Sequence, residues 1–522
     1  MFRLFKCLAI FGLASTVSAV PVNGSSQAET FISCLSSQPS LNLVTWSSNR
    51  RQFTNLTGAF NQRLYSSASA VVLPKDATAV AAAVKCALQF SRPVTARGGG
   101  HSYAGYGIGS GLDQGLVVYL SNFKSIHLKS DNRTVVVGGG AHLGDIALQL
   151  NQWGLAMAHG TCPMVGVGGH AGFGGFGFIS RAWGLTLDAI SAFDAVLANG
   201  TYVQGLTREQ DPDLFWALSD AAPNFAIVTA YHFVAHQKPA NVVQFDYGFS
   251  GLSPETMTQA FLAFQSWGKN SSPPELGIQF VVGANGSLDI SGLYYGAGDA
   301  FTNMMAPFVA SLPSGVSPTI NYTMSWIDSL ISAAQGQALS SKGQQDTKDC
   351  FYAKSLMTPD SDQLITAEAA NAFFSYLQNT DTVTQWFVEI DLYGGAGSYI
   401  NTIPLNQTSF AHRSSFLTFQ MYASSPTLNN PFPDYGFSYV DGMYDALVNP
   451  MKQAWGTSYG SYVNYVDPML SPAEVKTLYW SSQYDRLSQL KAKYDPNQTL
   501  WNPQAIQPSV SSVVSRRSVG EL

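Results

Sequence analysis

Two glycine-dense stretches decide the fold: RGGGHSYAGYGIGSG (97–111) and HGTCPMVGVGGHAGFGGFGFISRAWGLTLD (159–188). Glycine permits positive φ and a close approach of the backbone to a ligand. A Rossmann site around Gly172, Gly174, Gly175 and Gly177 is excluded, because no strand and helix frame it and no acidic residue stands at the ribose position. Successive loop amides can instead hold a phosphate-bearing cofactor without basic side chains.

Composition excludes two broad classes. Charged residues make up 11% of the 522 residues, aromatic residues make up 12%, and the formal net charge is −6. Disordered chains are rich in charge and poor in aromatics, so disorder is excluded. Nothing supplies the basic stripe that phosphate backbones require, so no nucleic-acid partner is expected. The length predicts two to four domains or one large two-lobed enzyme.

Hydrophobic patterning predicts two regions with different arrangements of helices and strands. Residues 70–96 form a strand, a helix at 76–90 with Asp76 as N-cap, and a second strand, and further strands follow at 115–120 and 133–138. From about 239, helices alternate with aromatic-rich strands. The predicted helices are 254–269, 362–378 and 473–494, and the predicted strands include 385–395, 416–423 and 462–466. Aromatics of such a sheet either face a cleft for a sugar or flat organic substrate or pack in the core.

The N-terminus predicts export. Residues 1–19 place Arg3 and Lys6 before a short apolar run and end at a plausible cleavage site after Ala19, which is typical of a secretory signal peptide, although a buried N-terminal helix is the alternative. No later stretch approaches a membrane span, so we expect a secreted, extracellular protein with no membrane partner. The tail after Ser509 is predicted to be disordered. Glycan acceptors agree with export; they are Asn23, Asn55, Asn132, Asn199, Asn270, Asn285, Asn321, Asn406 and Asn497.

The cysteines predict one disulfide. Cys7 leaves with the signal peptide, and an oxidising compartment favours a pair among the remaining four. We expect Cys34 to pair with Cys86, which leaves Cys162 as a functional thiol in a glycine-rich loop and Cys350 as a buried thiol. A Cys162–Cys350 disulfide is the alternative.

These features together resemble the vanillyl-alcohol-oxidase-type flavoproteins, and among them the berberine-bridge-enzyme-like branch. The resemblance covers nearly the whole mature chain and is carried by RGGGHSYAGYG (97–107), GTCPMVGVGGH (160–170), GLTLD (184–188), DLFWAL (213–218), NFAIV (224–228) and KYDPNQTLWN (493–502). Within the branch, FYAKSL (351–356), EIDLYGG (389–395) and YVNYVDPML (462–470) look like the fungal gluco- and chitooligosaccharide oxidases.

The resemblance implies an α+β fold: a two-lobed vanillyl-alcohol-oxidase-type FAD-binding domain plus a substrate domain with an antiparallel sheet flanked by helices. The implied boundaries are an FAD-binding domain at 20–238, a substrate-binding domain at 239–474 and a C-terminal return to the FAD domain at 475–522.

The same resemblance implies FAD bound covalently through His101 and Cys162, to the flavin 8α-methyl group and C6 respectively. Other residues would cradle the cofactor; they are Gly98, Gly99, Gly100, Ser102, Gly139, Val165, Gly166, Gly168, Gly169, His170, Ile227, Val228 and Asn502. No metal site is expected. The chemistry would belong to the cofactor, and the protein would position the substrate and tune the electrostatics.

Oxidation of a hydroxyl at an anomeric carbon also needs a base. A neutral tyrosine is poor at pH 7, so it needs a carboxylate nearby to accept its proton. Tyr465 and the assisting Asp391 look like that pair in the carbohydrate oxidases, while a core aromatic and a hydrogen-bonded strand residue are the alternatives. Tyr103, Glu389 and Gln279 are the candidate substrate contacts.

Two departures from the family pattern stand out. The family commonly carries a glycine run after DLFWAL, where this chain has Ser219 to Asn224, so contacts there are in doubt. Met164 replaces a smaller residue, whereas Val165 matches relatives that react with oxygen.

Three functions are therefore open. The first is a monomeric oxidase that converts the reducing-end C1 hydroxyl of chito-, cello- or xylo-type oligosaccharides to a lactone and reduces O2 to H2O2. The second is an FAD-linked oxidase or cyclase of a secondary metabolite. The third is a non-catalytic flavoprotein or sugar-binding module, against which both linkage residues and the Tyr465/Asp391 pair argue.

Overall fold

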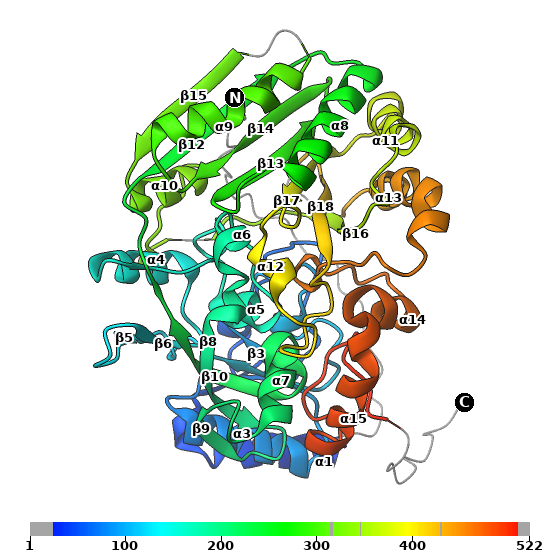
Figure 1. The fold of residues 1–522 in the computed structure, drawn as a ribbon. Coiled ribbons are helices and arrows are strands. Elements are labelled where there is room, and N and C mark those ends of the chain that lie inside the picture. The colour runs from blue at the N-terminus through cyan, green and yellow to red at the C-terminus, as the bar shows by residue number, and fades with distance from the viewer. Residues whose placement is uncertain (1–24, 314–316, 345, 428–430, 510–522) are drawn as a thin grey trace.

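The computed structural model describes residues 25–313, 317–344, 346–427 and 431–509. The predicted signal peptide at 1–19 and the predicted disordered tail after Ser509 lie outside the described residues. The described chain forms two lobes, with the largest sheet in the upper lobe of Figure 1 and the smaller sheets in the lower one. None of the described helices has both the length and the apolar character needed to cross a membrane.

The N-terminal sheet contains the predicted β-α-β unit. Its strands, in spatial order, are β1 (Leu43–Thr45), β2 (Ala70–Val72), β4 (Leu116–Tyr119) and β3 (Val94–Arg97). Strands β2 and β3 both run parallel to β4, so the chain between them must cross over, and helix α3 (Ala77–Gln89) does so. The Asp76 side chain accepts a hydrogen bond from Ala79 N at 2.8 Å, which confirms the predicted N-cap.

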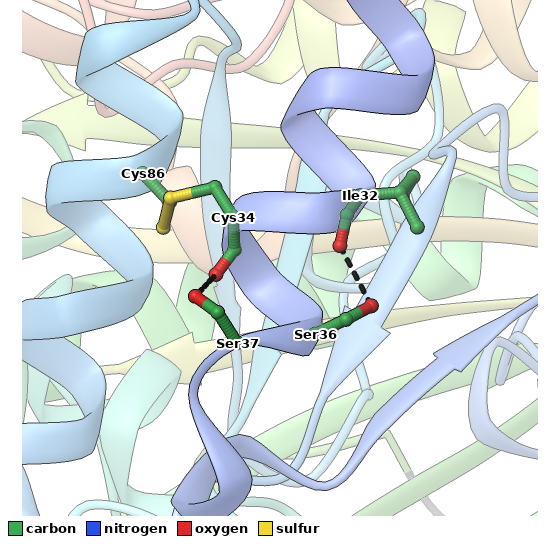
Figure 2. Close-up of a disulfide and its surroundings, with 5 residues drawn as sticks. All are labelled: Ile32, Cys34, Ser36, Ser37 and Cys86. Atoms are coloured by element: carbon green, nitrogen blue, oxygen red, sulfur yellow. Dashed lines mark hydrogen bonds between the residues drawn. A yellow bond between two sulfur atoms is a disulfide. The ribbon is translucent and has the colours of Figure 1, made fainter.

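The Cys34–Cys86 disulfide predicted from the sequence is present (Figure 2). It joins helix α1 (Ser25–Ser36) to α3 across a sequence separation of 52. The end of α1 is also tied locally, because Ser36 Oγ donates to Ile32 O and Ser37 Oγ donates to Cys34 O. Cys162 and Cys350 are not bonded to each other, so the alternative pairing is wrong.

A second sheet completes the lower lobe. It is antiparallel and has the order β5 (Ile126–Leu128), β6 (Thr134–Gly138), β10 (Ala226–Val234), β8 (Ile190–Leu197) and β9 (Tyr202–Leu206), and β11 (His236–Gln237) pairs separately with β7 (Leu155–Ala156). The helices of this lobe include α2 (Arg50–Leu56), α4 (Leu143–Gln152), α5 (Val167–Gly172), α6 (Ser180–Trp183) and α7 (Pro212–Ala221).

The upper lobe is built on a seven-stranded antiparallel sheet. Its order is β15 (Ser317–Met324), β12 (Val242–Phe249), β14 (Ser287–Tyr294), β13 (Leu276–Gly283), β17 (Gln385–Leu392), β18 (Ser415–Ser424) and β16 (Phe351–Pro359). Its helices are α8 (Pro254–Asn270), α9 (Gly298–Ser311), α10 (Trp326–Ala333), α11 (Ala367–Asn379), α12 (Tyr399–Thr402) and α13 (Asp434–Trp455). Helices α8, α11 and α13 lie along one face of the sheet and bury its aromatic core (Figure 1). An α+β fold with a helix-flanked antiparallel sheet is thereby confirmed.

The C-terminal part differs from two predictions. Residues 462–466 were expected as a strand but form the 3₁₀ turn η5 (Val463–Tyr465), in which Tyr465 N donates to Tyr462 O. The expected helix at 473–494 is broken into α14 (Pro472–Glu474), a π-turn η6 (Val475–Trp480), η7 (Ser481–Gln483) and α15 (Tyr484–Tyr494). The break has a cause: the Leu478 carbonyl accepts from Ser461 N outside the helix, and Ser481 takes a left-handed φ of 43°.

The helix expected from residue 362 begins later, at Ala367. The Thr366 side chain accepts a hydrogen bond from Ala369 N and caps the helix. The preceding Ile365 N donates to the side chain of Gln265 at 3.0 Å, so this residue is held outside the helix.

Candidate active site

A single cavity of about 2930 Å³ opens between the glycine-rich loops of the lower lobe and the seven-stranded sheet. Ligand pockets commonly measure about 300–1,000 Å³, so this one has room for a large cofactor and a substrate together. The sheet supplies side chains from β13, β17 and β18, on the face opposite to the buried aromatic core.

Glycines let the loops beneath the cavity touch. A Cβ on Gly99 would lie 2.4 Å from Gly166 N, and one on Gly168 would lie 2.8 Å from Gly139 O. Gly100 adopts a φ of 81°, which residues other than glycine rarely adopt. Gly169 has a different role, because a Cβ there would meet nothing within 4 Å, although the residue lines the cavity. Bare backbone thus faces the space that a ligand would fill.

His101 follows directly on this glycine run. The Phe60 ring stacks on its imidazole, with 4.1 Å between centroids and 23° between planes. On the other side, Nε2 lies 2.8 Å from Oδ2 of Asp346, which comes from the segment before β16. The imidazole is therefore held in one orientation by an aromatic ring and a carboxylate.

Cys162 opens into the same cavity. Its side chain is exposed, because the space that it meets is the cavity itself. Burial raises the pKa of the thiol to about 11, and the negative charge of Glu389 adds to this. The nearby His170, on α5, accepts a hydrogen bond from Gly160 N at 3.1 Å, and burial lowers its pKa to about 3, so the ring is neutral.

Two carboxyl groups face the cavity from β17. Glu389 and Asp391 are two residues apart on one strand, so their side chains lie on the same face. Burial raises the pKa of both: Glu389 to about 7, and Asp391 well above its usual value, where repulsion from Glu389 adds to the burial. Two like charges this close in a buried site cannot both form easily. The pair therefore retains a proton near neutral pH.

Strand register places a glutamine opposite each of the two carboxyl residues. Gln279 of β13 stands opposite Asp391, and Gln420 of β18 stands opposite Glu389. Tyr393, two residues further along, also hydrogen-bonds the Asp391 carboxylate, and its ring stacks on Phe176 at 4.0 Å. The acidic pair is thus set in a row of amide and hydroxyl groups.

Tyr465 approaches this row from η5. Its ring stacks on that of Tyr103, with 5.7 Å between centroids and 16° between planes. Gln420 Nε2 donates to the Tyr103 hydroxyl at 2.6 Å. Burial raises the pKa of Tyr465 well above 10, and the charges of Glu389 and Asp391 raise it further. The Tyr465 phenol is therefore protonated and lies next to groups that can take a proton.

The η5 turn is fastened to the glycine-rich loops. The Tyr462 hydroxyl accepts hydrogen bonds from Gly175 N at 3.0 Å and from Asn464 Nδ2 at 2.8 Å. Asn464 Nδ2 also donates to Phe173 O at 3.0 Å. On the other side, buried Asp467 bonds Lys354 Nζ at 2.6 Å. These bonds explain why 462–466 forms a turn rather than a strand, because its polar groups are satisfied by the loops.

The cavity gathers the predicted site residues with one exception. Those that line it are Gly98, Gly99, Gly100, His101, Ser102, Tyr103, Gly139, Cys162, Val165, Gly166, Gly168, Gly169, His170, Val228, Gln279, Glu389, Asp391, Tyr465 and Asn502. Ile227 does not line it: its side chain is buried in the apolar core between α3 and the N-terminal sheet, because alternate residues of β10 face opposite ways. Four further residues line the cavity and were not predicted from the sequence; they are Phe60, Asp346, Tyr393 and Gln420.

The departure after DLFWAL is visible in the backbone. Asp220 has a φ of 121° and breaks the end of α7, at the point where the family commonly carries glycines. Its carboxyl group is buried, which raises its pKa well above the usual value. Neighbouring Ala222, Pro223 and Asn224 still line the cavity.

Comparisons with known proteins agree with this site. A family model described as "FAD binding domain" matches residues 68–205, and one described as "Berberine and berberine like" matches 461–507. The xylooligosaccharide oxidase of Thermothelomyces thermophilus is 32% identical over 88% of this chain and 91% of its own length. The FAD-linked oxidoreductase dpmaF of Metarhizium anisopliae is 33% identical over 92% and 91%.

A solved structure of glucooligosaccharide oxidase from Acremonium strictum is similar throughout. It has a TM-score of 0.84 and 29% identity and covers 92% of this chain and 99% of its own. That protein is described as carrying a 6-S-cysteinyl, 8α-N1-histidyl FAD. FAD fits the cavity seen here, since the cavity offers bare glycine backbone and sufficient volume, and the His101 imidazole and the Cys162 thiol line it.

Proposed function

The chain belongs to the berberine-bridge-enzyme-like family of FAD-dependent oxidoreductases, and on that basis we propose that it oxidises the C1 hydroxyl at the reducing end of an oligosaccharide to a lactone. Molecular oxygen would be the acceptor and hydrogen peroxide the second product. One observation carries the proposal: a single cavity joins His101 and Cys162 to Tyr465 and the Glu389–Asp391 pair.

His101 and Cys162 would bind the flavin covalently from two sides, as in the similar glucooligosaccharide oxidase. The loops at 98–102, 139 and 165–170 would contact it through backbone, and Val228 and Asn502 would close the cavity around it. When bound, FAD supplies a two-electron acceptor for the hydrogen leaving C1 and passes those electrons to oxygen. Two anchors would also fix the ring relative to the sugar, which favours a reactive geometry.

Tyr465 is the proposed base. The C1 hydroxyl must lose its proton as hydride leaves the same carbon, and a phenol with a raised pKa can only relay that proton if a stronger acceptor stands beside it. The Glu389–Asp391 pair is that acceptor, because its charges act directly on Tyr465. The proton would pass from C1–OH to the Tyr465 oxygen as the phenolic proton moves to the carboxylate.

Polar side chains opposite the flavin loops would bind the sugar. Gln279, Glu389 and Tyr103 present amide, carboxyl and hydroxyl groups to the cavity, and these groups pair well with sugar hydroxyls. Gln420 holds the Tyr103 hydroxyl in place. The aromatic rings of Phe387 and Tyr422 form a neighbouring wall, 4.8 Å apart, on which a pyranose could stack.

The proposed setting is extracellular, with the protein acting as a monomer. The disulfide supports an oxidising compartment. The glycan acceptors whose side chains are described are all exposed; they are Asn55, Asn132, Asn199, Asn270, Asn285, Asn406 and Asn497.

The proposal is tested by peroxide release. The secreted protein is mixed with xylo-, cello- and chito-oligosaccharides in air, and both H2O2 and the aldonic acid formed from the lactone are quantified. We expect one peroxide for each aldonic acid with at least one series. Oxygen consumption without aldonic acid, or no turnover of any series, would contradict the sugar class.

One observation favours a second candidate, oxidation of an aromatic metabolite. Phe60, Tyr103, Phe387 and Tyr422 line the cavity and pack with the buried Phe351 in an aromatic cluster. Such a wall also suits a flat hydrophobic substrate, and one similar relative is described only as an FAD-linked oxidoreductase. Turnover of phenolic or allylic alcohols in place of every sugar would favour this candidate.

A further inference from the structure

His101 has a partner that the proposed sugar chemistry does not use. Asp346 lies on the loop before β16, and its Oδ2 is 2.8 Å from His101 Nε2. The two side chains are mostly buried, with 14% and 21% of their surfaces exposed. Among the described residues, the other oxygen of this carboxylate, Oδ1, is buried without a hydrogen-bond partner. The contact recorded for the Asp346 carboxylate is therefore the one with the His101 imidazole.

The contact selects one ring nitrogen. Nε2 lies 2.8 Å from a carboxylate oxygen, too close for two lone pairs to face each other, so Nε2 is the nitrogen that carries hydrogen, although its N–H is not aligned as a hydrogen bond to Oδ2. The lone pair is then on Nδ1. Stacking on Phe60 fixes the plane of the ring, so Nδ1 has a defined direction as well.

We propose that Asp346 is the positioning residue that directs covalent attachment of FAD to Nδ1 of His101. It does so by holding the nucleophilic tautomer and by stabilising the positive charge that the imidazole gains as the bond forms. The carboxylate of a catalytic triad acts on its histidine in the same way. This proposal rests on the covalent attachment given under the proposed function, and it does not depend on the substrate.

A C–N bond forms between His101 Nδ1 and the flavin 8α carbon, and one C–H bond of that methyl group breaks. The imidazole gives up one proton overall, and the flavin is left with two additional electrons and two protons. Molecular oxygen then removes these as hydrogen peroxide, which leaves the oxidised, attached cofactor.

The attachment at Cys162 should not need Asp346. Burial is the main reason why the pKa of Cys162 is raised, with Glu389 and then Asp346 adding to it. Removing the Asp346 charge therefore makes the thiol easier to deprotonate. The two bonds should respond separately, which makes each a control for the other.

The experiment compares the wild-type chain with Asp346→Asn, Asp346→Glu and Asp349→Asn, all secreted and purified as holoprotein. Asp349 is the matched control, because it lies three residues away, also lines the cavity, and accepts a hydrogen bond from Tyr422 rather than from a histidine. After denaturation and digestion, mass spectrometry measures the fraction of His101 and Cys162 peptides that carry flavin. No substrate is involved.

We expect both bonds in the parent and in Asp349→Asn. In Asp346→Asn, attachment at His101 should slow by about 10²–10⁴-fold, as for loss of a proton-handling group, so that most molecules are linked through Cys162 alone. That remaining bond reports an assembled cavity, which separates this outcome from misfolding. Asp346→Glu should restore most of the His101 bond.

An Asp346→Asn protein with as much flavin on His101 as the parent would overturn the proposal. Equal loss of the His101 and Cys162 bonds would overturn it too, because Asp346 would then serve the cavity as a whole. A parent with no His101 bond would contradict the attachment itself. A doubly linked parent that oxidises no sugar would contradict only the proposed substrate.

Discussion

Tyr465 is the side chain on which the proposed reaction depends. Its phenol is half-buried, stacked on Tyr103, and close to two carboxyl groups, so it is protonated at rest and needs those groups as proton acceptors. A sugar hydroxyl is a weak acid, and in the proposed reaction its proton has to leave in step with the hydride. Tyr465 lines the cavity with both carboxyl groups, so in the proposed reaction it would provide that path.

Tyr465→Phe should therefore slow flavin reduction by sugar by about 10²–10⁴-fold, because the relay loses its hydroxyl while the aromatic stack is retained. The measurement is the anaerobic reduction rate in a stopped-flow instrument. Tyr435→Phe, on the exposed side of α13, is the matched control and should reduce at the parental rate. An unchanged rate in Tyr465→Phe would remove the proposed base.

The carboxyl pair should make activity fall at low pH, which gives the pH profile of kcat/KM an acid limb. The proton acceptor works only when the pair carries a charge, so kcat/KM should rise with pH as the pair ionises, around the Glu389 pKa of about 7. In Glu389→Gln the group with the pKa of about 7 is gone, and the remaining acceptor is Asp391, whose pKa is raised first by burial, which the substitution leaves in place. The fall in activity at low pH should then be displaced from about pH 7 to the pKa of Asp391 alone.

The pH profile of kcat/KM for both proteins checks this prediction. Asp349→Asn serves as the control, because its carboxyl group bonds Tyr422 and does not face Tyr465 in the same row. A limb that stays near pH 7 in Glu389→Gln would show that a group other than Glu389 sets it and would contradict this prediction.

At the scale of elements, the η5 turn joins the two lobes. It is fastened to the glycine-rich loops by Tyr462 and Asn464 and to β16 by the ion pair between Asp467 and Lys354. Burial opposes the charge of Lys354, yet Asp467 holds its pKa above the ordinary value. Asp467 is only 4% exposed, so its charge depends on this partner.

Lys354→Met should lower the free energy of unfolding by about 3 kcal/mol, because a buried carboxylate loses its cation. Lys476 forms a similar 2.8 Å pair with Asp485 on the surface, and Lys476→Met should leave stability unchanged. Urea unfolding followed by fluorescence measures both. Equal midpoints for the two variants would contradict a structural role for the buried pair.

The elements also show how far sequence reasoning extends. The helix at 77–89 and the strands at 385–392 and 415–424 were predictable, because periodicity and capping are local signals. The turn at 463–465 was not, because its aromatic pattern is typical of a strand and its hydrogen bonds come from loops almost 290 residues away. Motif resemblance indicated His101, Cys162 and Tyr465, whereas Asp346 and Phe60 lie outside any such motif and needed the fold.

At the scale of the molecule, the disulfide staples the N-terminal helix to the lobe that would hold FAD. Chain-entropy arguments give a loop with a separation of 52 a stabilisation of about 4 kcal/mol. A Cys34→Ser/Cys86→Ser protein should therefore unfold at lower temperature, as measured by circular dichroism. Its flavin content should stay at the parental level, because neither cysteine lines the cavity. Loss of covalent flavin in that variant would contradict this prediction, because it would show that the disulfide is needed for the FAD site.

The cavity is lined by residues of both lobes, so one substrate bound in it would contact both. The lower lobe supplies glycine loops, an imidazole and a thiol, and the upper lobe supplies carboxyls and amides on one face of a sheet. The proposed oxidation of a sugar would take its electron acceptor from the first lobe and its proton acceptor from the second.

Anaerobic mixing of the secreted holoprotein with xylo-, cello- and chito-oligosaccharides, followed by its visible spectrum, tests this account most directly. We predict that at least one sugar bleaches the flavin fully in the absence of oxygen and that admitting air restores the yellow colour. A flavin that stays oxidised with every sugar would contradict the account.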